Sequence, residues 1–210
     1  MLALLRHSLF FTFLAFAGVS VAATDPHTVV QQTTDKLMAD LKINQDKYRT
    51  DPAAFYNAMD DILGQVIDAD GISKSVMTVR YSRRATPEQM QRFQENFKRS
   101  LMQFYGNALL EYDNQGIRVL PNSIAQGPKR SEVRMEVTDK KGVIYPVSYT
   151  MVKINNEWRM RNVIINGINL GKLFRDQFAE AMQRNRQDLD RVIDNWIETV
   201  AKTRAAQEDA

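Results

Sequence analysis

The chain has 210 residues, of which 44% are hydrophobic, and its 28 basic and 25 acidic side chains give a net charge of +3. It contains no cysteine and two histidines. The near-neutral balance, without a long block of like charge, excludes a nucleic-acid-binding arm. The residue counts exclude disulfide bonds and a cysteine nucleophile, and a multi-histidine metal site is excluded once an N-terminal signal peptide with His7 is removed, because His27 is then the one histidine left.

The N-terminal segment has the pattern of an export signal. Arg6 precedes an apolar stretch, residues 8–17, that is too short to span a bilayer, which needs about 20 residues of helix. Small residues follow and allow cleavage after Ala22, with cleavage after Ala23 as the near alternative. An N-terminal membrane anchor is the less favoured interpretation.

Cleavage after Ala22 would divide the chain into two parts. We expect a signal peptide over residues 1–22, a single domain over residues 23–210, and a periplasmic location. Since no cysteine is available in that oxidising compartment, stability must come from burial of apolar side chains.

Two helices are expected at the start of this domain. Asp25-Pro26 and Asp51-Pro52 each combine a capping side chain with a proline at the first helical position. The predicted buried faces carry Val29, Val30, Leu37, Met38 and Leu41 in the first helix and Phe55, Met59, Ile62, Leu63 and Val66 in the second. A shorter helical turn with Val76 and Met77 is expected next.

Thr86-Pro87-Glu88-Gln89 is a capping box, and it begins the strongest helical pattern in the chain. Its apolar stripe consists of Met90, Phe93, Phe97, Leu101, Phe104, Tyr105 and Ala108. A stripe of aromatic residues and methionine is typical of core packing, and it is also compatible with a cavity wall. Both interpretations remain open at this point.

The following residues alternate between polar and apolar side chains and predict strands. Four runs, near residues 117–120, 133–137, 143–151 and 158–165, are joined by short turns, which predicts an antiparallel meander. Pro146 predicts an edge or a bulge in the third run.

Asn166-Gly167 ends the last strand, and a helix with Phe174 and Phe178 four residues apart follows at once. One further amphipathic helix is expected, with its apolar stripe formed by Leu189, Val192, Ile193, Trp196, Ile197 and Val200. The fold class is therefore α+β, with a four-stranded antiparallel sheet and helices packed against it. If the helices stand off a curved sheet, an apolar cavity forms between them.

Motifs for common catalytic chemistry are missing from the sequence. There is no Gly-x-Ser-x-Gly elbow, no P-loop and no glycine pattern for a dinucleotide. Acidic pairs such as Asp60-Asp61 are best interpreted as solvated surface. Binding of an apolar ligand is therefore favoured, while an enzyme or an adaptor on a similar fold remains the alternative.

Two segments resemble a known family. They are the helix start from Ala85 to Phe93, and the run from Trp158 through Val163-Ile164-Ile165-Asn166-Gly167-Ile168-Asn169-Leu170 to Arg175-x-Gln177-Phe178. Together with the export signal, they resemble the MlaC family of periplasmic phospholipid-binding proteins, also known as the toluene-tolerance family. The sequence departs from the family pattern at Asn162, where Asp is more frequent, at Asn169, where Ser is frequent, and at Thr78, where Gly is expected.

The resemblance implies a monomeric carrier of glycerophospholipid, with no catalytic residues, metal or cofactor. Its implied partners are an outer-membrane lipoprotein–porin complex and an inner-membrane ABC transporter complex. At about 0.8 kcal/mol per methylene, exposing two tails of roughly 30 methylenes would cost about 24 kcal/mol, so such a carrier must enclose them. The expected tail contacts are Phe97, Leu101, Tyr105, Val137, Tyr149, Met151, Trp158, Met160, Val163, Ile165, Phe174 and Phe178. Arg80, Arg83 and Arg84 are candidates for the cavity rim or for a transporter-facing surface.

Overall fold

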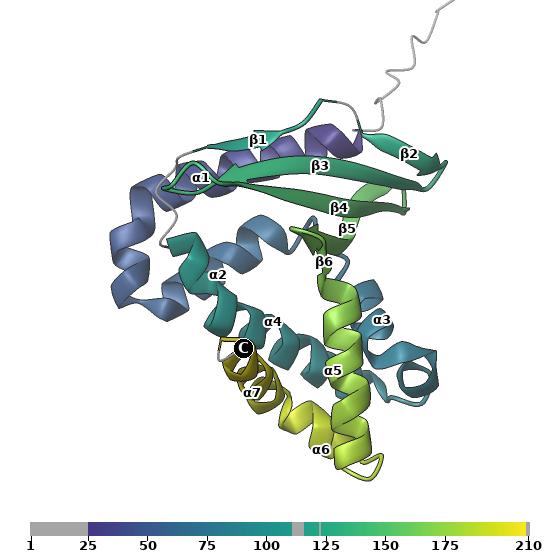
Figure 1. Cartoon of the computed structure of the whole chain (residues 1–210). Helices are drawn as coiled ribbons and strands as arrows, with labels where there is room; N and C mark the ends of the chain where they lie inside the picture. Colours follow the sequence, from purple (N-terminus) through teal and green to yellow (C-terminus); the bar gives the residue numbers. More distant parts are fainter. Residues whose placement is uncertain (1–24, 111–115, 122, 209–210) are drawn as a thin grey trace, which may run out of the picture.

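A twisted antiparallel sheet lies above a layer of helices in the computed structural model (Figure 1). The structure describes residues 25–110, 116–121 and 123–208, without the side chains of residues 104, 105, 107, 108 and 203–208. The predicted signal peptide, residues 1–22, lies outside the described residues. Among the described helices, none is both long and apolar enough to cross a membrane.

The helices occupy both ends of the described chain. They are α1 (Pro26–Thr50), α2 (Pro52–Leu63), α3 (Ala69–Ser82), α4 (Pro87–Leu110), α5 (Leu170–Arg184), α6 (Leu189–Asp194) and α7 (Trp196–Glu208). The strands lie between α4 and α5. They are β1 (Ile117–Val119), β2 (Ile124–Gly127), β3 (Arg130–Thr138), β4 (Ile144–Ile154), β5 (Glu157–Ile165) and β6 (Ile168–Asn169).

The sheet has six strands, so the predicted number of four is wrong. Its order is β1-β3-β4-β5-β6, and β2 also pairs with β3, beside β1. The sequence pattern missed β2 because its residues are exposed throughout and lack an apolar face. It missed β6 because this strand has only two residues, which pair with Ile164 and Ile165 of β5. The predicted α+β class and antiparallel pairing are confirmed.

The predicted helix starts are confirmed by their capping contacts. The Asp25 carboxylate accepts from the His27 N–H at 2.9 Å, and the Asp51 carboxylate accepts from the Ala54 N–H at 2.9 Å. In the capping box, the Thr86 N–H donates to Gln89 Oε1 at 2.9 Å and the Gln89 N–H donates to Thr86 Oγ1 at 3.2 Å. These contacts are local, which is why the sequence predicts them.

Pro146 lies in β4, beyond the last residue that pairs with β5, so the predicted edge is confirmed on that side and the predicted bulge does not occur. It pairs in regular register with Glu136 of β3, and its carbonyl oxygen accepts from the Asn166 N–H at 2.8 Å. In an antiparallel pair the N–H and C=O of one residue face the same neighbour. The donor that proline lacks would therefore face Asn166, where β5 has already ended.

The predicted C-terminal helix consists of two helices. Asn195 caps the end of α6, with its N–H donating to the Arg191 carbonyl oxygen at 3.1 Å, and α7 begins at the next residue. The apolar stripe continues across this break, so periodicity alone does not reveal it. Likewise, the helical turn predicted around Val76 and Met77 is the longer helix α3.

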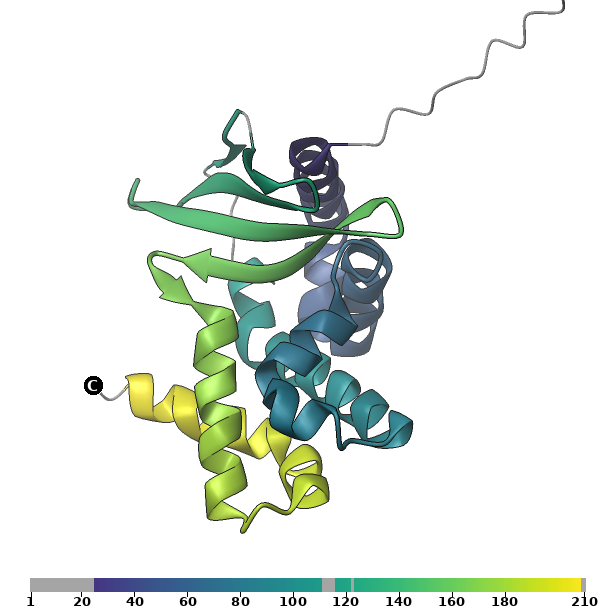
Figure 2. The ribbon, with the colours of Figure 1, turned by 90° about the vertical axis from the view of Figure 1, so that its right-hand side faces the viewer.

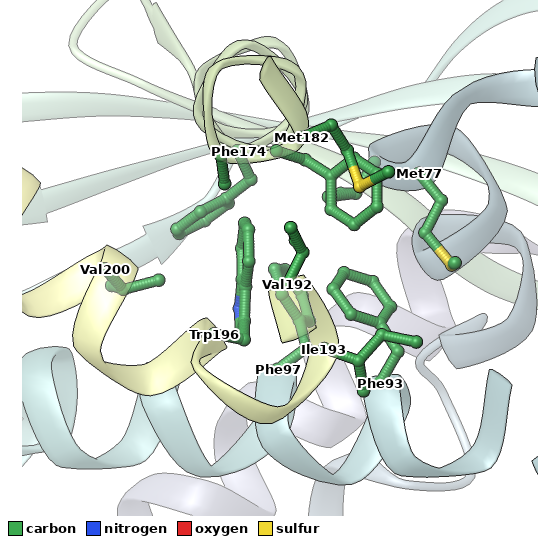
Figure 3. Close-up of a cluster of buried hydrophobic side chains, with 12 residues drawn as sticks. Met77, Phe93, Phe97, Phe174, Met182, Val192, Ile193, Trp196 and Val200 are labelled. Atoms are coloured by element: carbon green, nitrogen blue, oxygen red, sulfur yellow. The ribbon is translucent and has the colours of Figure 1, made fainter. Parts of the chain in front are cut away.

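The apolar side chains that the structure describes form three separate clusters. Figure 3 shows the largest one, in which Trp196 lies between side chains of α4 and α5. A second cluster joins α1 to the inner face of the sheet, with Val30, Val133 and Met151 among its members, and a third joins α1, α2 and α4. The sheet and the lower helices therefore have different cores, and α5 descends from the sheet into the helical layer (Figure 2).

Candidate functional site

A cavity of about 550 Å³ lies where β5 meets helices α2, α3 and α4. Its apolar wall is formed by Met59, Leu63, Ile67, Ile72, Phe97, Leu101, Met102, Met160 and Val163. Polar side chains, among them Asp60, Gln94 and Lys98, line the rest of it. A mainly apolar pocket of this volume, with a few polar groups, is typical of small-molecule binding sites.

The backbone between α2 and α3 holds the strand wall of this cavity in place. The Met160 N–H donates to the Val66 carbonyl oxygen at 2.7 Å, and the Asp68 N–H donates to the Met160 carbonyl oxygen at 2.9 Å. Ile67 thereby forms a parallel bridge with Met160. Both hydrogen-bonding groups of the Met160 backbone are therefore engaged by this segment, while its flexible side chain lines the cavity.

A β-bulge in β5 directs a charged side chain toward the helices. Met160 pairs with Met151 and Asn162 pairs with Thr150, so Arg161 is the extra residue. Its guanidinium forms an ion pair with the buried carboxylate of Asp68, which also caps α3 by accepting from the Gly71 N–H at 3.0 Å. A Cβ at position 71 would overlap both charged groups, so glycine is required there.

A second, smaller cavity of about 70 Å³ lies between α1 and the sheet. Leu63 and Met160 line both cavities and therefore separate them. Tyr149 faces the small cavity, and burial raises the pKa of its hydroxyl to about 12. This hydroxyl therefore stays neutral over the physiological pH range.

A groove of about 650 Å³ adjoins the large cavity and is lined by residues of α1, α2 and α4. It contains two arginines, Arg49 and Arg99, and shares Tyr56 and Met102 with the large cavity. Helices α2 and α4 pack closely here, since a Cβ at Gly106 would lie 2.8 Å from the Phe55 ring. In the part of the chain that the structure describes, no group of three or more acidic or histidine side chains could hold a metal ion.

The structure brings only some of the predicted tail contacts together. Phe97, Leu101, Met160 and Val163 line the large cavity, and Tyr149, Met151 and Met160 line the small one. Their contact with lipid stays a prediction, because the geometry identifies the wall and not its occupant.

The remaining predicted contacts lie elsewhere. Phe174 and Phe178 are buried in the helical cluster, and Val137 packs against the sheet cluster. The Trp158 ring has the Lys153 ammonium 5.8 Å from its centroid and lines a surface pocket. Ile165 is exposed at the end of β5. The side chain of Tyr105 lies outside the described part of α4.

Sequence reasoning missed the wall contributed by α2 and α3. Met59 and Leu63 were expected in a buried helical face, but their role beside a cavity depends on how α2 packs against β5. One signal was available, because the apolar pattern continues past Gly64 to Val66 and Ile67. Arg80, Arg83 and Arg84, the candidates for the rim, line none of the cavities described above.

Comparison with known proteins identifies the family. The profile of the MlaC protein family matches residues 31–198. The toluene tolerance protein ttg2D of Pseudomonas putida is 60% identical over 100% of this chain and 97% of its own. The intermembrane phospholipid transport system binding protein MlaC of Haemophilus influenzae is 24% identical over 72% of each chain.

A solved structure shares the fold. It is a phospholipid-binding protein from Ralstonia solanacearum in complex with a phospholipid, with a TM-score of 0.76 and 24% identity, and the match covers 85% of this chain and 99% of that one. The family profile and the 60% identity over the whole chain confirm the resemblance found in the sequence. The chain therefore belongs to the MlaC protein family.

Proposed function

We propose that this chain is a periplasmic phospholipid carrier that holds the acyl tails of a glycerophospholipid in the large cavity between β5 and helices α2, α3 and α4. The observation that carries this proposal is the apolar wall of a cavity of about 550 Å³, found in a chain of the MlaC protein family. The Ralstonia solanacearum protein with the same fold was solved with a phospholipid, which supports the class of ligand.

Physical chemistry explains why such a cavity suits a carrier. Each methylene exposed to water costs about 0.8 kcal/mol, so a diacyl lipid leaves a membrane readily only when its tails are enclosed. Transport requires no covalent step, so we place the chain among binding proteins rather than enzymes. Release requires a wall that can move, and the soft side chains of Leu63, Met102 and Met160 suit that requirement.

The proposal includes the route. Residues 1–22 direct export, and residues 23–210 form the carrier, which acts as a monomer between an outer-membrane lipoprotein–porin complex and an inner-membrane ABC transporter complex. The name of the Haemophilus influenzae relative, an intermembrane phospholipid transport system binding protein, supports this route. No nucleic-acid partner is proposed.

Native mass spectrometry of the purified mature chain tests the proposal. We expect a bound mass that corresponds to diacyl phospholipid. An empty chain whose thermal stability does not change after a delipidation step would contradict the proposal.

A matched pair of variants tests whether the large cavity holds the lipid. Leu101→Trp places a larger side chain in the cavity and should lower retained lipid by about tenfold or more. Ile43→Trp makes a similar change at a site that is 80% exposed and should retain lipid as the wild type does. Equal retention by two folded variants would show that the tails lie elsewhere.

A further inference from the structure

Neighbouring cations on α4 have different partners. The Lys98 ammonium lies 3.0 Å from the Asp60 carboxylate and 3.4 Å from the Glu95 carboxylate. Arg99 is exposed and forms no ion pair with any described residue. One full positive charge is therefore left without an acidic partner beside the groove lined by α1, α2 and α4.

Other hydrogen-bond donors face the same groove. Gln103 follows Arg99 by four residues, which places both side chains on one face of α4. Tyr56 reaches the groove from α2. Within the described part of the chain, neither the Gln103 amide nor the Tyr56 hydroxyl has a hydrogen-bond partner, so both are available to a ligand.

The second arginine of the groove is already engaged. Arg49 lies 3.0 Å from the Asp46 carboxylate, and it also donates to the Leu110 carbonyl oxygen at 3.4 Å. Its charge is therefore balanced by the Asp46 carboxylate. The anion-binding capacity of the groove therefore depends mainly on Arg99.

We propose that this groove binds a phosphate group, that of the lipid whose tails fill the adjoining cavity, through Arg99 with Tyr56 and Gln103 as neutral donors. This assignment rests on the proposed function. Arginine presents a planar array of donors that matches phosphate oxygens in a bidentate arrangement. Because Tyr56 and Met102 line both spaces, a headgroup in the groove stays joined to tails in the cavity.

Charge explains why phosphate would prefer the groove to the rim of the cavity. The cavity lining contains Asp60 and Asp61, and the Lys98 charge is already offset by Asp60 and Glu95. A phosphate at that rim would meet carboxylates of like charge.

The Tyr56 hydroxyl also suits a phosphate ligand. Burial raises the pKa of this hydroxyl, so it stays protonated and able to donate a hydrogen bond.

The first arm of the test compares two lipids with the same tails, phosphatidic acid and diacylglycerol, as competitors that displace a fluorescent fatty acid from the delipidated protein. Wild type should bind phosphatidic acid more tightly. Arg99→Gln should lower the affinity for phosphatidic acid by about tenfold and leave the affinity for diacylglycerol unchanged. Tyr56→Phe should lower the affinity for phosphatidic acid by about threefold, since it removes a neutral hydrogen-bond donor.

The control is Arg175→Gln, which removes an exposed arginine of α5 that also forms no ion pair within the described residues. It should leave both affinities unchanged. If Arg175→Gln lowers the affinity for phosphatidic acid as much as Arg99→Gln does, general charge attraction explains the preference for this lipid over diacylglycerol, and the groove assignment is wrong. The same conclusion follows if Arg99→Gln lowers the affinities for both lipids equally or changes neither affinity.

The second arm uses inorganic phosphate alone and follows the side-chain Nε–H resonance of Arg99 by NMR. If phosphate shifts this resonance while Arg99→Gln leaves the preference for phosphatidic acid intact, the groove takes free phosphate and the headgroup assignment is overturned. If wild type binds neither lipid, the proposed function fails, and the phosphate titration alone decides whether the groove binds this anion.

Discussion

The helical core and the sheet–helix junction are built from the same kinds of side chain, yet they differ in what those side chains contact. In the core, the Phe93 ring meets the Phe178 and Trp196 rings edge to face, with centroids 5.5 Å and 5.3 Å apart, and all three are fully buried. At the junction, Leu101 and Val163 are only partly buried and face a cavity. One helix, α4, supplies both environments.

Phe97 marks the boundary between the two regions. Its ring contacts Phe174 with centroids 5.1 Å apart, and it also lines the large cavity. An apolar stripe therefore predicts an apolar neighbour without identifying it as protein or ligand. The difference should be measurable, because a packed side chain leaves a void when it is truncated, whereas a cavity-lining one enlarges a space that already exists.

The largest expected effect is on folding. Phe178→Ala should lower the free energy of unfolding by about 3 to 5 kcal/mol, while Leu101→Ala should lower it by about 1 to 2 kcal/mol. Urea unfolding of the delipidated variants measures both values. Equal losses would mean that the junction is packed as tightly as the core, and the distinction between the two regions would fail.

The next effect concerns the contact that joins the regions. Asp68 is 8% exposed, caps α3 and forms an ion pair with Arg161 of the bulge. Asp68→Ala should therefore lower the free energy of unfolding by about 2 to 3 kcal/mol. Asp70→Ala is the matched control, because its ion pair with Lys74 is more than half exposed and should contribute under about 0.5 kcal/mol. Thermal and urea unfolding compare the two variants. Similar losses would show that the bulge does not stabilise the junction.

Elements fixed by local contacts were predictable from sequence, and those fixed by distant ones were not. The capping residues Asp25, Asp51 and Thr86 act within four residues of themselves, so they locate three helix starts. β2 is the opposite case, since it is exposed along its length and is a strand only because β3 lies beside it. The break at Asn195 is hidden by a continuous apolar stripe.

The cavity wall follows the same rule. Leu101 and Val163 were recognisable as apolar positions on a helix and a strand. Met59 and Leu63 become wall residues only because the Val66 and Asp68 backbones bond to Met160, which is distant in sequence. Phe174 and Phe178 have the same pattern and belong to the protein's own core. Local periodicity carries no information about that assignment.

A smaller effect is expected at the partly buried Thr78, which follows the core residues Val76 and Met77. Thr78 interrupts α3 with φ 62° and ψ 164°, a region that is essentially restricted to glycine. Thr78→Gly should therefore raise the free energy of unfolding by about 1 kcal/mol. Ser75→Gly, at a regular helical position of α3, should lower it by about 0.5 kcal/mol. If both variants lower the free energy of unfolding, the backbone at position 78 is not strained.

An effect of about the same size as that at Thr78 is expected at the turn from β5 into α5, where the two regions are covalently joined. Asn162 Oδ1 accepts from the Gly171 N–H at 3.0 Å, and Asn162 Nδ2 donates to Asn169 Oδ1 at 3.1 Å. Asn169 Oδ1 also caps α5 by accepting from the Lys172 N–H at 3.0 Å. Asn162→Asp keeps the acceptor for Gly171 but sets a carboxylate against the Asn169 oxygen, which should cost about 1 kcal/mol.

Adding Asn169→Ser should restore part of that loss, because a serine hydroxyl can donate to the carboxylate and still accept from Lys172. A double-mutant cycle in urea should give a coupling free energy of about 0.5 to 1 kcal/mol. Additive losses would mean that the two side chains act independently, and that the β5–α5 turn is held by its backbone and not by this contact.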